Sequence, residues 1–249
     1  MHTWMKQGIE DLSGRKVVVI GGSGGIGACI SRMLADAKAD IVVHGGHRKG
    51  ALEQVAGECR RRGARCETVL LELKGPKDVS SLLGSSVPDI LVVALGPIRW
   101  TGVSKETAGG WQDMALLNLA IPGALVSACL PEMKQRRFGR IILFGASRGE
   151  VAPASLEATA YTAAKSGLVS LARSVAKDAS GYDVSCNVLC PGYVDTEYLS
   201  DGQRERFARR APSGRLSSPE DIAGLALYLC GSSARVINGA VINAGQGLA

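Results

Sequence analysis

The chain has 249 residues, of which 46% are hydrophobic, 21% charged and 4% aromatic. These proportions exclude a disordered or fibrous protein and allow one large α/β domain with an aliphatic core. The net charge is +6 (29 basic minus 23 acidic residues), but the basic clusters lie far apart and lack interleaved aromatic residues. We therefore expect solvated helix ends and no nucleic-acid surface.

Apolar segments rich in β-branched residues alternate with segments of helical periodicity. The alternation predicts a parallel sheet with helices on both faces, a doubly wound Rossmann-type α/β fold in a single domain, 1–249. The predicted strands are 16–20, 41–44, 68–71, 89–95, 140–144, 184–190 and 240–243. The predicted helices are 26–37, 50–62, 111–136, 158–179 and 219–230. The segment 193–214 is polar, basic and of low regularity.

Hydrophobic runs and cysteines bear on the cellular compartment. No apolar run approaches the roughly 18 residues of a membrane span, and no apolar signal core follows Met1, so we expect a cytoplasmic protein without membrane contact. The seven cysteines form no CxxC pair and lie mostly in apolar runs. They are typical of small buried side chains in a reducing compartment, and we expect no metal site.

A glycine-rich turn joins the first predicted strand to the first predicted helix. Glycines at its first, fifth and seventh positions let the chain turn tightly, let backbone N–H groups approach a dinucleotide pyrophosphate and let the helix pack close to the sheet. The expected cofactor contacts in this turn are Gly21, Ser23, Gly24, Gly25, Ile26 and Gly27. Similar turns occur in α/β domains that bind no nucleotide, so this motif alone is weak.

Tyr161 and Lys165 are four residues apart and lie on one face of a predicted helix. Transfer of a hydride to a carbonyl carbon requires a proton for the oxygen, and the ordinary pKa of tyrosine, about 10, is too high for efficient exchange near neutrality. A lysine charge one turn away favours the phenolate. The alternative is an exposed helix pair without function.

Five motifs in order resemble the short-chain dehydrogenase/reductase family over essentially the whole chain. They are the glycine turn, Asn118, the pair Tyr161 and Lys165, the segment 191–196, and 238–242. The resemblance is to a divergent member similar to 3-oxoacyl reductases. It implies an oxidoreductase that reduces a carbonyl to an alcohol, or the reverse, by hydride transfer from a nicotinamide cofactor.

The same resemblance implies a small-molecule carbonyl or alcohol substrate, a homodimer or homotetramer formed through the helices at 111–136 and 158–179, and a substrate lid at about 193–214. A second hypothesis is a non-catalytic dinucleotide-binding protein that senses redox state or regulates a partner.

The resemblance also assigns catalytic roles. Tyr161 is implied as the general acid/base, Lys165 as the group that lowers its pKa and binds the nicotinamide ribose, and Asn118 as the holder of a proton-relaying water. An asparagine buried or bent within a helix for structural reasons is the alternative for Asn118.

The serine that contacts the substrate oxygen in the family is displaced. Its usual position falls on Ala146, one residue before Ser147. We prefer Ser147 for this role and keep Ser155 as a second candidate.

The end of the second predicted strand indicates the cofactor. No carboxylate stands there to bind the adenosine ribose, and His47-Arg48-Lys49 precedes the next acid, Glu53. Cations without an opposing carboxylate suit a ribose 2′-phosphate, so NADP(H) is favoured and NAD(H) remains possible. The alternative is a solvated basic loop, and Gly24 stands where many NADP-using relatives have a basic residue.

Further cofactor contacts are implied at the ends of later strands. They comprise His47, Arg48, Glu72, Leu73, Ala94, Gly96, Pro191, Gly192, Val194 and Thr196, besides Tyr161 and Lys165. Arg99 and Arg148 are candidates to meet a carboxylate or phosphate on the substrate.

Overall fold

A parallel sheet forms the centre of the computed structural model, which describes residues 10–84 and 86–248. Within this part the seven strands follow the order β3-β2-β1-β4-β5-β6-β7, and every neighbouring pair is parallel. They are β1 (Lys16–Ile20), β2 (Asp40–Gly45), β3 (Cys66–Leu70), β4 (Ile90–Val93), β5 (Gly139–Phe144), β6 (Val184–Pro191) and β7 (Val241–Ala244). The chain reverses its direction of winding between β1 and β4, where such sheets bind ligands. The predicted fold class is confirmed.

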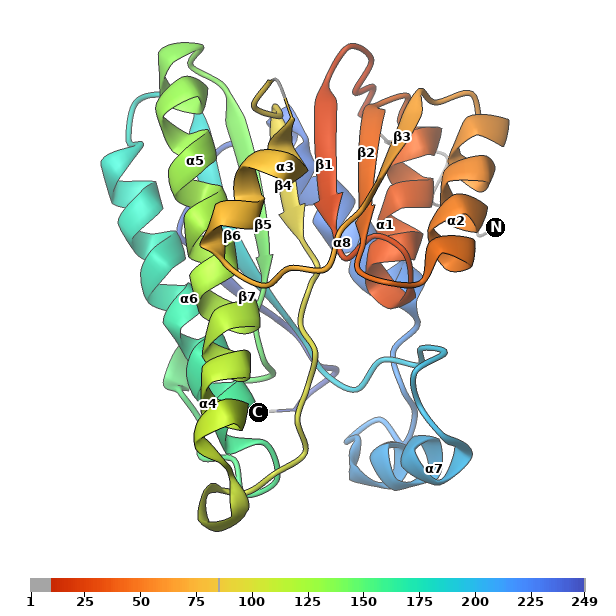
Figure 1. Cartoon of the computed structure of the whole chain (residues 1–249), viewed down its shortest axis with the longest axis vertical. Helices are drawn as coiled ribbons and strands as arrows, with labels where there is room; N and C mark the ends of the chain where they lie inside the picture. The colour runs from red at the N-terminus through yellow and green to blue at the C-terminus, as the bar shows by residue number, and fades with distance from the viewer. Residues whose placement is uncertain (1–9, 85, 249) are drawn as a thin grey trace.

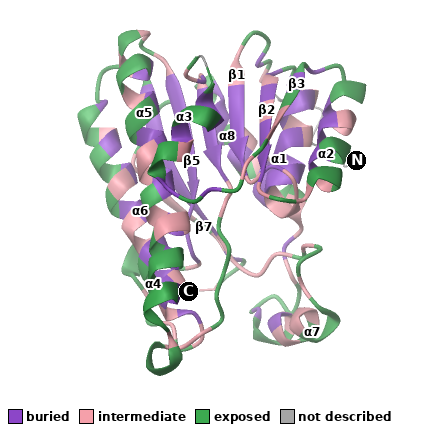
Figure 2. Cartoon of the chain, viewed as in Figure 1, coloured by how far each residue is buried: buried purple, intermediate pink, exposed green. Residues whose placement is uncertain are grey.

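Helices cover both faces of this sheet (Figure 1). One face carries α1 (Gly25–Asp36), α2 (Lys49–Arg61) and α8 (Pro219–Cys230). The other carries α3 (Val79–Leu83), α4 (Ala108–Ala115), α5 (Ile121–Gln135) and α6 (Thr159–Asp178). The strands β1, β2, β4, β5 and β6 are largely buried between these layers (Figure 2), which explains their continuous apolar runs, whereas the edge strands β3 and β7 are partly exposed.

The helical stretch from α4 to α5 is the one described helix long and apolar enough to cross a membrane. Its side chains Ile121, Leu125, Cys129 and Met133 belong to the core on the α6 face of the sheet. The hydropathy of this stretch therefore reflects packing against the strands. All seven cysteines are free and buried, as predicted.

The segment 193–214 is more regular than its sequence indicated, because it contains helix α7 (Asp201–Arg210) below the carboxyl ends of the strands (Figure 1). Ser200 caps the helix by accepting a hydrogen bond from the Gln203 backbone, and the Gln203 side chain accepts one in return from Ser200. Phe207 is the buried side chain of α7. One apolar residue gives no helical periodicity, so the pattern missed this helix. The short helix α3 was missed as well.

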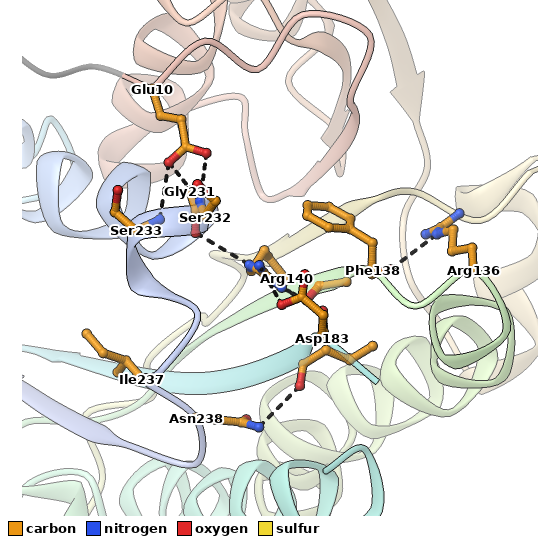
Figure 3. Close-up of polar contacts among 12 residues, drawn as sticks. Glu10, Arg136, Phe138, Arg140, Asp183, Gly231, Ser232, Ser233, Ile237 and Asn238 are labelled. Carbon is orange, nitrogen blue, oxygen red and sulfur yellow. Dashed lines mark hydrogen bonds and ion pairs between the residues drawn. The ribbon is translucent and has the colours of Figure 1, made fainter. Parts of the chain in front are cut away.

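Arg140 anchors the far end of the sheet although it is charged and only 1% exposed. Its guanidinium donates to the backbone oxygens of Asp183 at 2.7 Å and Gly231 at 3.4 Å and pairs with the Asp183 carboxylate at 3.0 Å. The ring of Phe138 lies 4.6 Å away (Figure 3). The contacts join β5 to the turn before β6 and to the end of α8.

The same corner holds the start of the described chain. The Glu10 carboxylate accepts hydrogen bonds from the backbone of Ser232, at 2.7 Å, and of Ser233 (Figure 3). These contacts lower the pKa of Glu10, although partial burial opposes the shift. The carboxylate therefore ties residues before β1 to the segment after α8.

We predict that Arg140→Met lowers the free energy of unfolding by about 2–4 kcal/mol, because the buried carbonyl oxygens of Gly139 and Gly231 lose this donor and Asp183 loses its ion pair. Urea denaturation measures the change. Arg209→Met removes an arginine whose ion pair with Glu205 is exposed, and its effect should stay within about 0.5 kcal/mol. Equal effects in the two variants would show that the buried guanidinium has no special role.

Candidate active site and cofactor cradle

The glycine turn between β1 and α1 brings backbone very close to backbone. Gly21 has φ 78° and Gly25 has φ 51°, both in the left-handed region. A Cβ on Gly21 would lie 2.9 Å from the Leu95 nitrogen, and a Cβ on Gly27 would overlap the Gly21 carbonyl oxygen. Side chains are therefore excluded at the positions where the sequence predicted a dinucleotide cradle.

A residue that the sequence reading missed, His44, supports this turn from β2. Its Nδ1 accepts a hydrogen bond from the Gly21 N–H at 3.3 Å, and its Nε2 lies 2.8 Å from the Leu71 oxygen. An Nε2–H tautomer satisfies both contacts. Burial lowers the pKa of His44, which keeps the ring neutral. A polar residue at the end of an apolar strand was the available signal.

Several predicted cofactor residues do surround the turn. Ser23 lies against Gly45, where a Cβ would be 3.0 Å from the serine Oγ. The backbone of Ala94 faces Gly21, and the Thr196 methyl group would lie 3.5 Å from a Cβ on Gly25. The Arg48 side chain reaches the edge of Gly24. Residues from four separate parts of the chain thus meet at this turn.

Three other predicted contacts differ in their burial and partners. The Leu73 side chain is buried in the core, so only its backbone remains free for a ligand. Glu72 is exposed and pairs with Lys74 at 3.2 Å, and the His47 side chain is exposed. Of the basic run after β2, Arg48 is the residue that the structure brings to the glycine turn.

The predicted segment after β6 is fixed to its neighbours. The Gly192 N–H donates to the Ala244 oxygen at 3.2 Å, and a Cβ on Gly192 would lie 2.8 Å from the Gly245 Cα. Val194 forms a β-bridge with Ser217. Pro191 itself ends β6. Thr196 is thereby carried back toward the glycine turn.

Tyr161 and Lys165 lie one turn apart on α6, as predicted. The Lys165 ammonium lies 5.9 Å from the centroid of the Tyr161 ring. Lys165 is only 1% exposed, and its Nζ donates to the Leu95 oxygen at 3.0 Å. A Cβ on Gly96 would lie 2.8 Å from this Nζ and 3.3 Å from the Asn118 Oδ1. Gly96 therefore leaves the space in which the lysine and asparagine converge.

Asn118 is fully buried at the centre of a π-helical turn, Leu116–Ala120, between α4 and α5. Such turns often mark functional sites. Its Nδ2 donates to the Pro97 oxygen at 3.2 Å, whereas its Oδ1 has no hydrogen-bond partner among the described residues. A buried acceptor without a donor is costly and suits a bound water. A purely structural role for Asn118 accounts for the distorted helix, but it does not account for the unpartnered Oδ1.

The titration behaviour of the pair differs from the expectation. Burial, with a smaller contribution from the nearby Cys190, raises the pKa of Tyr161 to about 12. Burial lowers the pKa of Lys165 to about 7, although Cys190 opposes this shift. The expected lowering of the tyrosine pKa by the lysine is therefore absent here. Desolvation is the largest cause of the pKa shift of both groups.

The serine candidates occupy different surroundings. Ala146 is buried, whereas Ser147 is half-buried, and its hydroxyl has no partner in the described part of the chain. The next residue, Arg148, is exposed and has φ 59°. The Ser155 hydroxyl accepts a hydrogen bond from the Ala158 N–H at 3.1 Å. Ser147 is thus the freer hydroxyl of the two.

The Arg99 side chain is already paired with another side chain of the protein. Its Nε pairs at 2.8 Å with a Glu106 carboxylate whose side chain is fully buried. This pairing counts against the predicted role in binding an anionic substrate. Among the described residues no cluster of three or more His, Cys, Asp or Glu side chains is arranged to hold a metal.

The family model described as enoyl-(acyl carrier protein) reductase matches residues 21–249. The chain belongs to the short-chain dehydrogenase/reductase family. It is 28% identical to the 3-oxoacyl-(acyl-carrier-protein) reductase FabG of Escherichia coli K12 over 96% of this chain and 98% of that protein. It is 27% identical to the D-beta-hydroxybutyrate dehydrogenase of Cupriavidus necator over 93% and 96%, respectively.

Among solved structures of the family, the angucycline C-6 ketoreductase LanV with bound NADP is similar with a TM-score of 0.88. It is 28% identical and the match covers 96% of this chain and 97% of that one. The actinorhodin polyketide ketoreductase with NADPH has the same fold, with a TM-score of 0.84 over 94% and 97%. This short-chain dehydrogenase/reductase is therefore an oxidoreductase, as its sequence predicted.

We predict that the stability difference between the wild type and Lys165→Met depends on pH. The pKa of Lys165 is about 7 in the folded protein and 10.5 ordinarily, so between these values the unfolded chain binds a proton that the folded chain lacks. Wild-type stability relative to the variant should rise by about 2–4 kcal/mol from pH 7 to pH 10.5. Urea denaturation across this range measures it. A difference that stays constant would mean that Lys165 remains charged when buried.

Proposed function

We propose that this short-chain dehydrogenase/reductase is an NADP(H)-dependent enzyme that reduces a small-molecule carbonyl compound to an alcohol, or catalyses the reverse reaction. The observation that carries the proposal is the convergence of Lys165 and Asn118 beneath Gly96, one helical turn from Tyr161. A buried lysine and an unpartnered amide oxygen are expensive to maintain without a function.

The cradle around Gly21, Gly25 and Gly27 supports a dinucleotide, because the close approach of backbone to backbone excludes side chains there and brings the amino terminus of α1, with its N–H groups, to the ends of the strands. The cofactor, when bound, supplies or accepts the hydride. Arg48 is proposed to bind the 2′-phosphate, and Thr196 to contact the cofactor from the segment after β6. The reductases and the NADP-bound ketoreductase among the relatives support this assignment.

In reduction, Tyr161 is proposed to donate its phenolic proton to the substrate oxygen while the carbonyl carbon receives the hydride. The phenolate then needs a proton from solvent. Asn118 Oδ1 is proposed to accept a hydrogen bond from a water molecule that begins the transfer of this proton. Lys165, when its ammonium group is charged, is proposed to stabilise the phenolate. Ser147 is proposed to donate a hydrogen bond to the substrate oxygen.

We propose further that the segment 193–214, including α7, covers the substrate and that α4–α5 and α6 form the contacts of a homodimer or homotetramer. Membership of the family supports these proposals. The proposed substrate is a small molecule whether the protein forms a dimer or a tetramer.

We predict that Tyr161→Phe lowers turnover by about 10²–10⁴-fold and changes cofactor affinity little, because the ring remains and only the proton donor is lost. NADPH consumption with a panel of ketones, aldehydes and acyl thioesters measures turnover. Tyr182→Phe, at a partly exposed tyrosine outside the site, should behave as the wild type. Cofactor binding without turnover on any substrate would instead favour a non-catalytic sensor.

We predict that Arg48→Ala lowers the ratio of kcat/KM for NADPH to that for NADH by roughly tenfold or more, because a phosphate loses its charged donor. The steady-state kinetics of both cofactors measure it. Arg65→Ala removes a comparably charged residue that pairs with Asp40 on the surface and should leave the ratio unchanged. A ratio that stays constant in Arg48→Ala would assign the 2′-phosphate to another group.

A further inference from the structure

The amino terminus of α1 already holds an anion, the Glu197 carboxylate. The Gly25 N–H donates to Glu197 Oε1 at 2.9 Å and to Oε2 at 3.2 Å. The two residues are 172 positions apart in the sequence. Helix amino termini attract negative charge through unpaired N–H groups and the helix dipole. A side chain of the protein thus occupies the position proposed for the cofactor pyrophosphate.

A second group at this position, Arg48, is also engaged by the same segment. Its guanidinium donates to the Tyr198 hydroxyl, lies 4.7 Å from the centre of the Tyr198 ring and lies 3.9 Å from the Glu197 carboxylate. Arg48, the proposed ligand of the 2′-phosphate, is therefore bound to Glu197 and Tyr198, the same segment that occupies the amino terminus of α1.

Gly24 provides the room for these contacts. A Cβ there would collide with the Tyr198 hydroxyl, the Arg48 guanidinium and the Glu197 carboxylate. Its φ of −171° is extended backbone that any residue adopts, so conformation does not require glycine. Instead, the absence of a side chain at Gly24 leaves the space that these three side-chain ends occupy, and a larger residue there would displace them from the turn.

The segment is held in place from α7. Arg204 pairs with Asp195 at 2.7 Å and donates to the Thr196 oxygen at 3.1 Å. At the other end of α7, Arg210 forms a two-bonded ion pair with Glu157, just before α6. The position of Glu197 is thus coupled to a helix that also contacts the active-site region.

We propose that Glu197 is an internal competitor of the cofactor: its carboxylate occupies the pyrophosphate position, and its displacement frees Arg48 to bind the 2′-phosphate. The inference rests on the proposed function. Two anions cannot share one set of N–H donors without strong repulsion, so a dinucleotide must move Glu197 away from α1. Cofactor binding then breaks the Arg48–Tyr198 contact and releases the segment that precedes α7.

The test compares Glu197→Gln with Glu205→Gln, which removes the same charge from an exposed site on α7. Isothermal titration with NADPH and with NADH gives the affinities of the full-length protein. We expect Glu197→Gln to bind both dinucleotides about threefold to tenfold more tightly than the wild type, because both carry the pyrophosphate. Glu205→Gln should match the wild type. Equal affinities in all three proteins would overturn the proposal, as would a gain confined to NADPH.

Hydrogen exchange separates this inference from the proposed function. Without nucleotide, the Gly25 amide should exchange faster in Glu197→Gln than in the wild type and Glu205→Gln. Added NADPH should speed exchange in the segment around Glu197 of the wild type. Faster Gly25 exchange without any dinucleotide binding would support the contact and refute both the proposed function and the competition. Unchanged Gly25 exchange with normal NADPH binding would overturn the competition alone.

Discussion

The site depends on close packing of glycine backbone against neighbouring backbone at the carboxyl ends of β1 and β4. Gly21 lies against the backbone of Leu95, and Gly27 lies against Gly21. A methyl group at either position would push α1 away from the sheet. The approach brings the amino terminus of α1 to the point where the strand order reverses, so the fold creates an anion-binding position before any charged side chain contributes.

A third glycine extends the constraint to the surroundings of Lys165 and Asn118. Gly96 leaves room for the Lys165 ammonium and the Asn118 amide oxygen beneath the strand end. Both groups are buried, and the π-helical turn directs Asn118 inward. Burial makes charge on Lys165 costly and lowers its pKa to about 7. The site thus holds its lysine close to the midpoint of its titration at neutral pH, where small electrostatic changes alter its charge.

Charge pairing differs between the two ends of the sheet. On the cofactor side, Arg48 and the start of α1 are bound to Glu197 and Tyr198 through exposed contacts that are individually weak and exchangeable. At the far end of the sheet, Arg140 is buried among backbone oxygens and Asp183 and serves as a permanent anchor. Exposed Arg48 therefore forms contacts that can be exchanged, whereas buried Arg140 forms permanent structural contacts.

Local sequence patterns determined the sheet, its main helices, the glycine turn and the Tyr161–Lys165 spacing, because strand runs, helix periodicity and tight turns depend on residues close in the chain. Tertiary structure alone decided four other features: the pKa values of Tyr161 and Lys165, the pairing of Arg99 with Glu106, the support from His44, and the carboxylate of Glu197 at α1. Each depends on which distant elements the strand order brings together and on how fully water is excluded there. Helix α7 belongs with these features, since its single buried residue, Phe207, stacks on Tyr193 and gives no local periodicity.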